Sequence, residues 1–76
     1  MKEVLKNIIS NLVDNEEAVE INQIDSEKSI TFEVKVAEAD MGKVIGKQGK
    51  VAKAIRTVMK SLAAKEHKKV VIEFVD

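Results

Sequence analysis

The sequence predicts an α+β fold in which helices cover one face of a three-stranded mixed sheet. Apolar residues recur at helical spacing at the start of the chain and again after residue 50. Alternating or β-branched runs lie between these segments and at the end of the chain. A strand, a helical crossover and a second strand place the crossover helices on one face of a sheet. With 76 residues, the chain is expected to form one domain, residues 1–76.

The first half of the chain is predicted to form a helix and a hairpin. The helix covers residues 2–14 and ends at Asp14-Asn15. "EAVEINQI", residues 17–24, predicts a strand, and the polar residues 25–29 predict a turn. The two strands are expected to pair antiparallel around a loop of about five residues. The second strand, "SITFEVKVA", alternates cleanly and points four residues inward: Ile30, Phe32, Val34 and Val36.

Two helices and a strand are predicted in the second half. Asp40 is a suitable N-cap for a short helix over residues 41–45. A longer helix runs from about Lys50 to Lys65, and basic residues near its end complement the helix dipole. "KVVIEFV", residues 69–75, predicts a well-buried strand, which completes the order α-β-β-α-α-β. The predicted apolar face of the longer helix consists of Val51, Ala54, Ile55, Val58 and Leu62, opposite Lys53, Arg56 and Lys60.

All three glycines of the chain lie within residues 42–49, and no proline occurs. Gly46 is placed where a helix end favours the left-handed region, and Gly49 where a missing side chain lets another backbone approach. The first N–H groups of the following helix lack internal partners, and such groups attract phosphate. With Lys43, Lys47 and Lys50 nearby, the stretch predicts a bare, basic turn that binds a phosphodiester backbone.

The glycines admit other interpretations. Gly-x-x-Gly alone is a weak pattern, and the glycines could serve only a tight turn between two helices. Gly42 and Gly46 also form G-x-x-x-G, but the apolar context of a membrane dimer motif is absent. A P-loop is excluded, because three residues rather than four separate these glycines and Lys47 is followed by Gln48.

The zero formal net charge hides a strong asymmetry between the two halves of the chain. Residues 1–40 carry four bases and ten acids, whereas residues 41–76 carry nine bases and three acids. Residues 41–65 contain seven bases and no acid. Such asymmetry suggests an anionic partner for the basic half, although two differently solvated faces would give the same totals.

"VIGKQGKVAKAI", residues 44–55, resembles the signature of the KH RNA-binding domain, an aliphatic-Ile-Gly-x-x-Gly motif followed by aliphatic residues at helical spacing. The element order matches the type II KH fold over essentially the full chain, and the small size is similar to the stand-alone bacterial KH proteins of the KhpA family. The resemblance implies that Gly46, Lys47, Gln48 and Gly49 clamp about four backbone nucleotides. It further implies that Ile45 lies in the groove floor and that four basic side chains make peripheral phosphate contacts: Lys43, Lys50, Lys53 and Arg56.

The composition restricts how such a site would bind. The chain has no Trp or Tyr, and Phe32 and Phe74 lie in strand patterns that favour core packing. Aromatic stacking platforms are therefore not expected. Binding should rest on phosphate contacts, shape and aliphatic packing, and should be weak, sequence-tolerant and dependent on salt. The residues themselves fit single-stranded RNA and single-stranded DNA equally.

The resemblance also implies partners and a cellular role. Members of this family are associated with a second KH protein of the KhpB (Jag) type and with self-association, so a homodimer or a heterodimer is expected. The implied role is that of a cytoplasmic RNA chaperone in post-transcriptional regulation, linked to cell envelope growth and cell shape. No cofactor and no membrane partner are expected, since the chain has no cysteine and no apolar run of membrane-spanning length. Met1 followed by an amphipathic run is expected to be the mature start, without a secretory leader.

Functions of other classes remain as alternatives. An enzyme is disfavoured, because His67 lies beside Lys68 and Lys69 at a helix end and no metal-ligand spacing occurs. A protein-interaction module could use the Gly-x-x-Gly surface for dimerisation, with RNA binding secondary. A KH module of a ribosome-associated or transcription factor is the third alternative.

Overall fold

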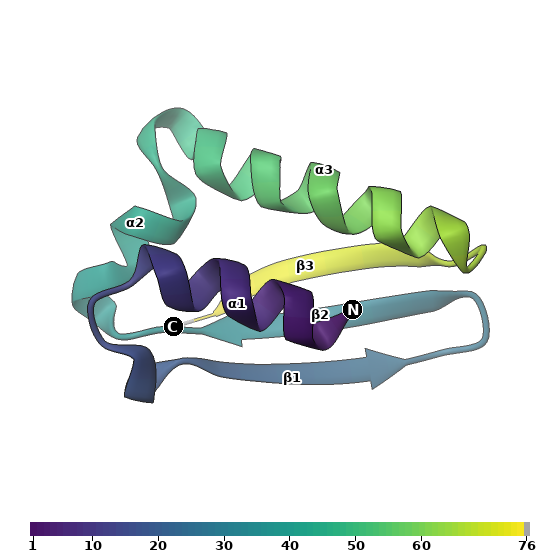
Figure 1. Cartoon of the computed structure of the whole chain (residues 1–76), viewed down its shortest axis with the longest axis horizontal. Helices are drawn as coiled ribbons and strands as arrows, with labels where there is room; N and C mark the ends of the chain where they lie inside the picture. Colours follow the sequence, from purple (N-terminus) through teal and green to yellow (C-terminus); the bar gives the residue numbers. More distant parts are fainter. Residues whose placement is uncertain (76) are drawn as a thin grey trace.

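The sheet has the predicted mixed topology, with strand order β1-β2-β3. The computed structural model describes residues 1–75 (Figure 1). Strand β1, Glu20–Asp25, pairs antiparallel with β2, Ser29–Lys35, and β2 pairs parallel with β3, Lys69–Val75. Since β2 is central, β1 and β3 are both edge strands. The α+β prediction with the α-β-β-α-α-β order of a type II KH fold is therefore confirmed.

Three helices accompany the sheet. Helix α1 covers Lys2–Leu12, α2 covers Met41–Ile45 and α3 covers Lys50–Lys65. Figure 1 shows α1 and α3 on one face of the sheet, with the short α2 at one end of the molecule. The bounds of α2 and α3 agree with the prediction, because the glycines and Asp40 mark them in the sequence.

The elements before residue 30 differ in detail from the prediction. Helix α1 ends at Leu12 rather than at residue 14, and a 3₁₀ turn at Glu16–Ala18 delays the first strand to Glu20. The hairpin loop has three residues, 26–28, instead of about five. It is closed by the Ser26 N–H, which donates to the Ser29 carbonyl at 2.8 Å. These short-range serine contacts extend both strands by about one residue.

The hydrophobic core lies between the sheet and the two longer helices. The alternation of β2 is confirmed, since all four residues predicted to point inward are buried. Phe32 is fully buried at the centre of β2, as the prediction of core packing required. Helix α1 contributes Leu5 and Ile9, and the flanking strands contribute Ile21, Val70 and Ile72.

Two burial predictions were wrong. Strand β3 is buried on one face only, because no helix within residues 1–75 covers the other face of the sheet; Val71 is 37% exposed. The apolar face predicted for α3 is rotated, since Ala54 is exposed and Val58 is 46% exposed. The buried residues of α3 are instead Ala52, Ile55, Met59 and Ala63.

Helix α3 ends in a left-handed residue that is not glycine. His67 has φ 57°, its N–H donates to the Ala64 carbonyl at 3.1 Å, and the Lys68 N–H donates to the Ala63 carbonyl at 3.0 Å. This pair of bonds is the Schellman arrangement, which satisfies carbonyls at the helix end. His67 therefore closes α3 through its backbone.

Candidate nucleic-acid interface

The turn of residues 46–49, hereafter the GKQG turn, joins α2 to α3 (Figure 1). Gly46 ends α2 with φ 76° and ψ 174°, a combination that is essentially confined to glycine. The sequence predicted a left-handed Gly46, and the positive φ is confirmed, but ψ is extended. A Cβ built on Gly46 would lie 2.8 Å from the Val51 Cβ and 2.9 Å from the Val51 nitrogen. The close backbone approach predicted for Gly49 therefore occurs at Gly46 instead.

Gln48 and Gly49 are both left-handed. Their dihedral angles, φ 56° and ψ 26° for Gln48 and φ 73° and ψ 14° for Gly49, are those of a type I′ turn. The Lys50 N–H donates to the Lys47 carbonyl and closes this turn. Nothing lies within 4 Å of a Cβ at Gly49, so this glycine is required by conformation rather than by space.

Free backbone donors lie in the turn itself, in addition to those that the sequence predicts at the start of α3. Within the turn, the Gly49 N–H donates to the Gly46 carbonyl at 3.2 Å, and the Lys50 N–H, the first of α3, donates to the Lys47 carbonyl. The N–H groups of Lys47 and Gln48 have no acceptor among residues 1–75. Because both residues are exposed, two adjacent backbone donors are available to an anionic ligand.

The basic side chains that the sequence predicts around the turn fall into two groups. Lys47, Lys50 and Lys53 are exposed, and no ion pair holds them within residues 1–75. Lys43 and Arg56 are instead engaged within the chain, as described below. Ile45, predicted in the groove floor, is half-buried and packs against the core.

Lys43 belongs to an ion-pair cluster built around a buried carboxylate. Asp40 is the one charged residue within residues 1–75 that is buried, with a side chain 3% exposed. It accepts the Asp14 N–H at 3.2 Å and the Asn15 N–H at 3.0 Å. The Lys43 ammonium lies 3.4 Å from Asp40 Oδ1 and also pairs with the Asp14 carboxylate. Asp40 occupies the predicted N-cap position of α2, but its side chain makes no cap hydrogen bond there. The side chain instead holds the segment after α1 against the start of α2.

The same contacts shift two pKa values. The backbone donors of Asn15 and Asp14, and then Lys43, lower the pKa of the Asp40 carboxyl. The carboxylates of Asp14 and Asp40 raise the pKa of the Lys43 ammonium. The positive charge of Lys43 is therefore already balanced by two acids within the chain, whereas no ion pair holds Lys47 within residues 1–75.

Replacing Asp40 with asparagine is expected to lower Tm at pH 7 and to flatten the acid limb of the stability profile. The folded pKa of Asp40 is lowered, so its contribution is present above the unfolded pKa and is lost as the pH falls through the folded pKa. The carboxylate of Asp40 accepts the two N–H groups on two different oxygens, whereas the amide of asparagine has one oxygen and one NH₂ group. Thermal unfolding from pH 7 to pH 2 measures the effect. Glu38→Gln is the control, because Glu38 is exposed and lies with Asp40 in the 3₁₀ turn Glu38–Asp40. Equal profiles for the two variants would contradict the assignment.

Arg56 contacts the edge strand β3. Its guanidinium donates to the Ile72 carbonyl at 3.3 Å and lies 5.6 Å from the centre of the Phe74 ring. The sequence placed Arg56 on the solvated side of α3 as a phosphate contact. Its side chain is exposed overall, yet its charged end is held against β3 by a hydrogen bond and a cation–π contact. Helical periodicity cannot reveal this arrangement, because the partners lie sixteen and eighteen residues further along the chain.

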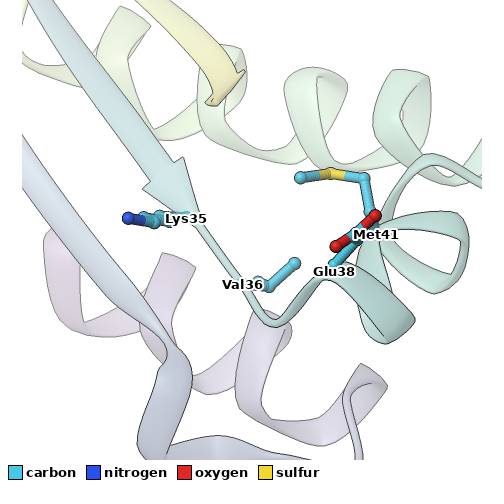
Figure 2. A pocket seen from close by; sticks show the side chains of 4 residues that line it. All are labelled: Lys35, Val36, Glu38 and Met41. Carbon is cyan, nitrogen blue, oxygen red and sulfur yellow. The ribbon is translucent and has the colours of Figure 1, made fainter. Parts of the chain in front are cut away.

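A pocket of about 440 Å³ lies beside the start of α2. Figure 2 shows its lining side chains, which come from the end of β2, the following segment and the first residue of α2: Lys35, Val36, Glu38 and Met41. Two of these side chains are apolar, and the other two carry opposite charges. Among residues 1–75, no group of His, Asp and Glu side chains has the arrangement needed for a metal ion.

The chain was compared with protein families and with known proteins. The family model for the KhpA/KhpB KH domain matches residues 2–74. The RNA-binding protein KhpA of Clostridium perfringens is 56% identical over 75 residues, which cover 99% of this chain and 100% of that protein. The proteins of the same name from Caldanaerobacter subterraneus and Clostridium acetobutylicum are 55% and 53% identical, with the same coverage.

The remaining comparisons add two findings. No solved structure matches the chain. None of the helices within residues 1–75 has the length and apolar character that crossing a membrane would require.

Proposed function

Because this chain belongs to the KhpA/KhpB KH-domain family, we propose that it binds single-stranded RNA through the GKQG turn. The observation that carries the proposal is the pair of backbone N–H groups without an acceptor at the exposed residues Lys47 and Gln48. Two such donors next to a lysine form a concave site for a phosphate oxygen. The names of the relatives, all RNA-binding proteins, support the same ligand.

Each residue has a defined part in this proposal. Gly46 and Gly49 set the backbone of the turn, and Lys47 and Gln48 donate to the sugar–phosphate chain. Lys50 and Lys53 extend the positive surface along the first turn of α3, where the helix dipole also favours anions. Ile45 supplies apolar contact below the bases, and Lys43 and Arg56 contribute less to phosphate binding than the sequence suggested.

Salt titration tests the proposal. With three free lysines at the site, the slope of log affinity against log salt for a single strand is expected to be about −2, so affinity falls about twentyfold from 50 to 200 mM salt. Fluorescence anisotropy with a labelled oligouridine measures this slope. Binding that does not change with salt, or no binding at 50 mM salt, would contradict a site built on phosphate contacts.

The proposal extends to association and to a cellular role. Residues 1–76 form one KH domain that acts in the cytoplasm as an RNA chaperone, as a homodimer or with a second KH protein of the KhpB type. Two weak sites on one RNA would bind more tightly through effective concentration. A post-transcriptional role in cell envelope growth and cell shape completes the proposal.

A second function, dimerisation with RNA binding secondary, is favoured by the exposed apolar residues Ala54 and Val58 on α3. Light scattering of the titration samples, with and without RNA, separates the two functions. If RNA and self-association compete, both use the surface around the GKQG turn. If they do not compete, association uses a separate surface.

A further inference from the structure

We infer that Arg56 contacts a nucleobase rather than a phosphate, and that it favours bases with two adjacent hydrogen-bond acceptors, namely cytosine or guanine. This inference rests on the proposed function, since it concerns the RNA bound beside the GKQG turn. It starts from the side chain itself, whose guanidinium is fixed against β3 by the Ile72 carbonyl and the Phe74 ring.

The fixed position argues against a phosphate contact. A lysine on a flexible stem follows a phosphate wherever the chain places it, whereas a guanidinium held at two points presents its donors in one plane. An arginine side chain has five N–H donors, and the Ile72 carbonyl takes only one bond. The remaining N–H donors of the exposed Arg56 can therefore bind a planar ligand that has hydrogen-bond acceptors at matching positions.

The edge of β3 adds an acceptor to this pattern. Because β3 pairs only with β2 among residues 1–75, its other edge carries no strand, and Arg56 reaches the Ile72 carbonyl of this edge strand from α3. A carbonyl oxygen has two lone pairs, so Ile72 can accept a second hydrogen bond. Arg56 and Ile72 together present donors next to an acceptor, with the Phe74 ring behind them.

The position fits RNA held by the GKQG turn. Arg56 follows Gly49 by seven residues, which is about 10 Å along the helix axis. Figure 1 shows β3 running below α3 back toward the end of the molecule that carries the turn. A KH clamp spans about four nucleotides, so a base of the clamped segment can reach this distance.

Base chemistry then selects the ligand. Two parallel N–H donors of arginine match two adjacent acceptors, as in O6 and N7 of guanine. In single strands the Watson–Crick edges are also open, and cytosine presents O2 and N3 side by side. Its N4 amino group could in addition donate to the Ile72 carbonyl. Adenine and uracil have no such adjacent pair of acceptors, so they should bind less well.

The experiment compares oligouridine with oligomers in which a central run of about four uridines is replaced by adenosine, cytidine or guanosine. The wild-type chain is expected to bind the cytidine or guanosine oligomer at least about fivefold more tightly than the other two. Arg56→Lys keeps the charge but loses the planar fork, so it should still bind all four oligomers with the preference removed. A preference for cytidine alone would show that the Ile72 carbonyl takes part, and a preference for guanosine alone that Arg56 reads the base by itself.

Lys53→Gln on the same helix is the matched control. It removes an exposed charge and should weaken binding to all oligomers equally, with the preference unchanged. Ratios of affinity are used because they do not depend on the folded fraction of a variant. Equal binding of all oligomers by the wild type, or a preference that survives in Arg56→Lys, overturns the inference and leaves the RNA-binding proposal intact. No binding of any oligomer at low salt overturns both.

Discussion

Replacing Lys47 and Gln48 together with aspartate is expected to weaken RNA binding about a hundredfold. The change replaces one positive and one neutral side chain with two negative ones beside the two free N–H groups of the turn. Unit charges about 4 Å apart interact by roughly 1 kcal/mol in water and 4 kcal/mol near a protein surface. Turning attraction into repulsion therefore costs about 3 kcal/mol, and each 1.4 kcal/mol is a factor of ten in affinity.

The fold is expected to survive this change. Both positions are exposed, and aspartate is among the residues that tolerate the left-handed conformation of Gln48. Anisotropy measures binding, and circular dichroism with thermal unfolding measures the fold. Lys2→Asp with Asn7→Asp is the control, because it makes the same charge change at exposed positions of α1, whose N-terminal end lies away from the turn (Figure 1). Unchanged affinity of the Lys47/Gln48 variant, or equal losses in the two variants, would remove the turn from the RNA site.

Gly46→Ala is expected to destabilise the protein by about 2–4 kcal/mol, the largest effect among the three glycines. Alanine has to adopt backbone angles that are nearly exclusive to glycine, and its Cβ would overlap Val51. The overlap includes the Val51 backbone nitrogen at 2.9 Å, so a rotamer change of Val51 cannot relieve it. A shift of Tm by about 10–20 °C follows for a domain of this size.

The other two glycines are the internal controls. Gly49→Ala should cost only about 1 kcal/mol, since the left-handed angles disfavour alanine but nothing lies within 4 Å. Gly42→Ala, in an exposed helical position with open space, should be neutral or stabilising by up to about 1 kcal/mol. Chemical denaturation of the three variants gives the ranking. A Gly49→Ala variant less stable than Gly46→Ala would show that the turn has a different shape.

The fold could be predicted from the sequence where local pattern and burial agree. The alternation of β2 was read correctly because a central strand has one face toward the core and a period of two residues. The limits of α2 and α3 were also correct, since Gly46 and Gly49 end and begin helices for conformational reasons. The GKQG turn could be located from the sequence for the same reason. The positive φ of Gly46 was predicted correctly, but the close backbone approach predicted at Gly49 occurs at Gly46.

The burial of α3 could not be predicted in the same way. Its sequence contains two neighbouring apolar stripes, and periodicity alone does not say which one faces the sheet. The stripe with Ala52 and Ala63 is buried, where small side chains let a helix approach a sheet closely. Val58 belongs to the other stripe and remains 46% exposed.

The partners of charged residues were likewise out of reach of sequence reasoning. Asp40 and Asn15 are 25 residues apart, and the bond between them exists only because the fold brings the end of α1 to the start of α2. Lys43 was assigned to phosphate because it lies near the glycines, while its acidic neighbours come partly from this distant segment. The contacts of Arg56 with β3 could not be predicted either, because Ile72 lies 16 residues further along the chain.

The contact between Gly46 and Val51 bears on the energetics of recognition. A turn whose shape is set by packing against its own helix is ordered before any ligand arrives. The entropy cost of arranging the turn is then met during folding and not during association. Preorganisation of this kind raises the affinity that a few weak, charge-based contacts can give.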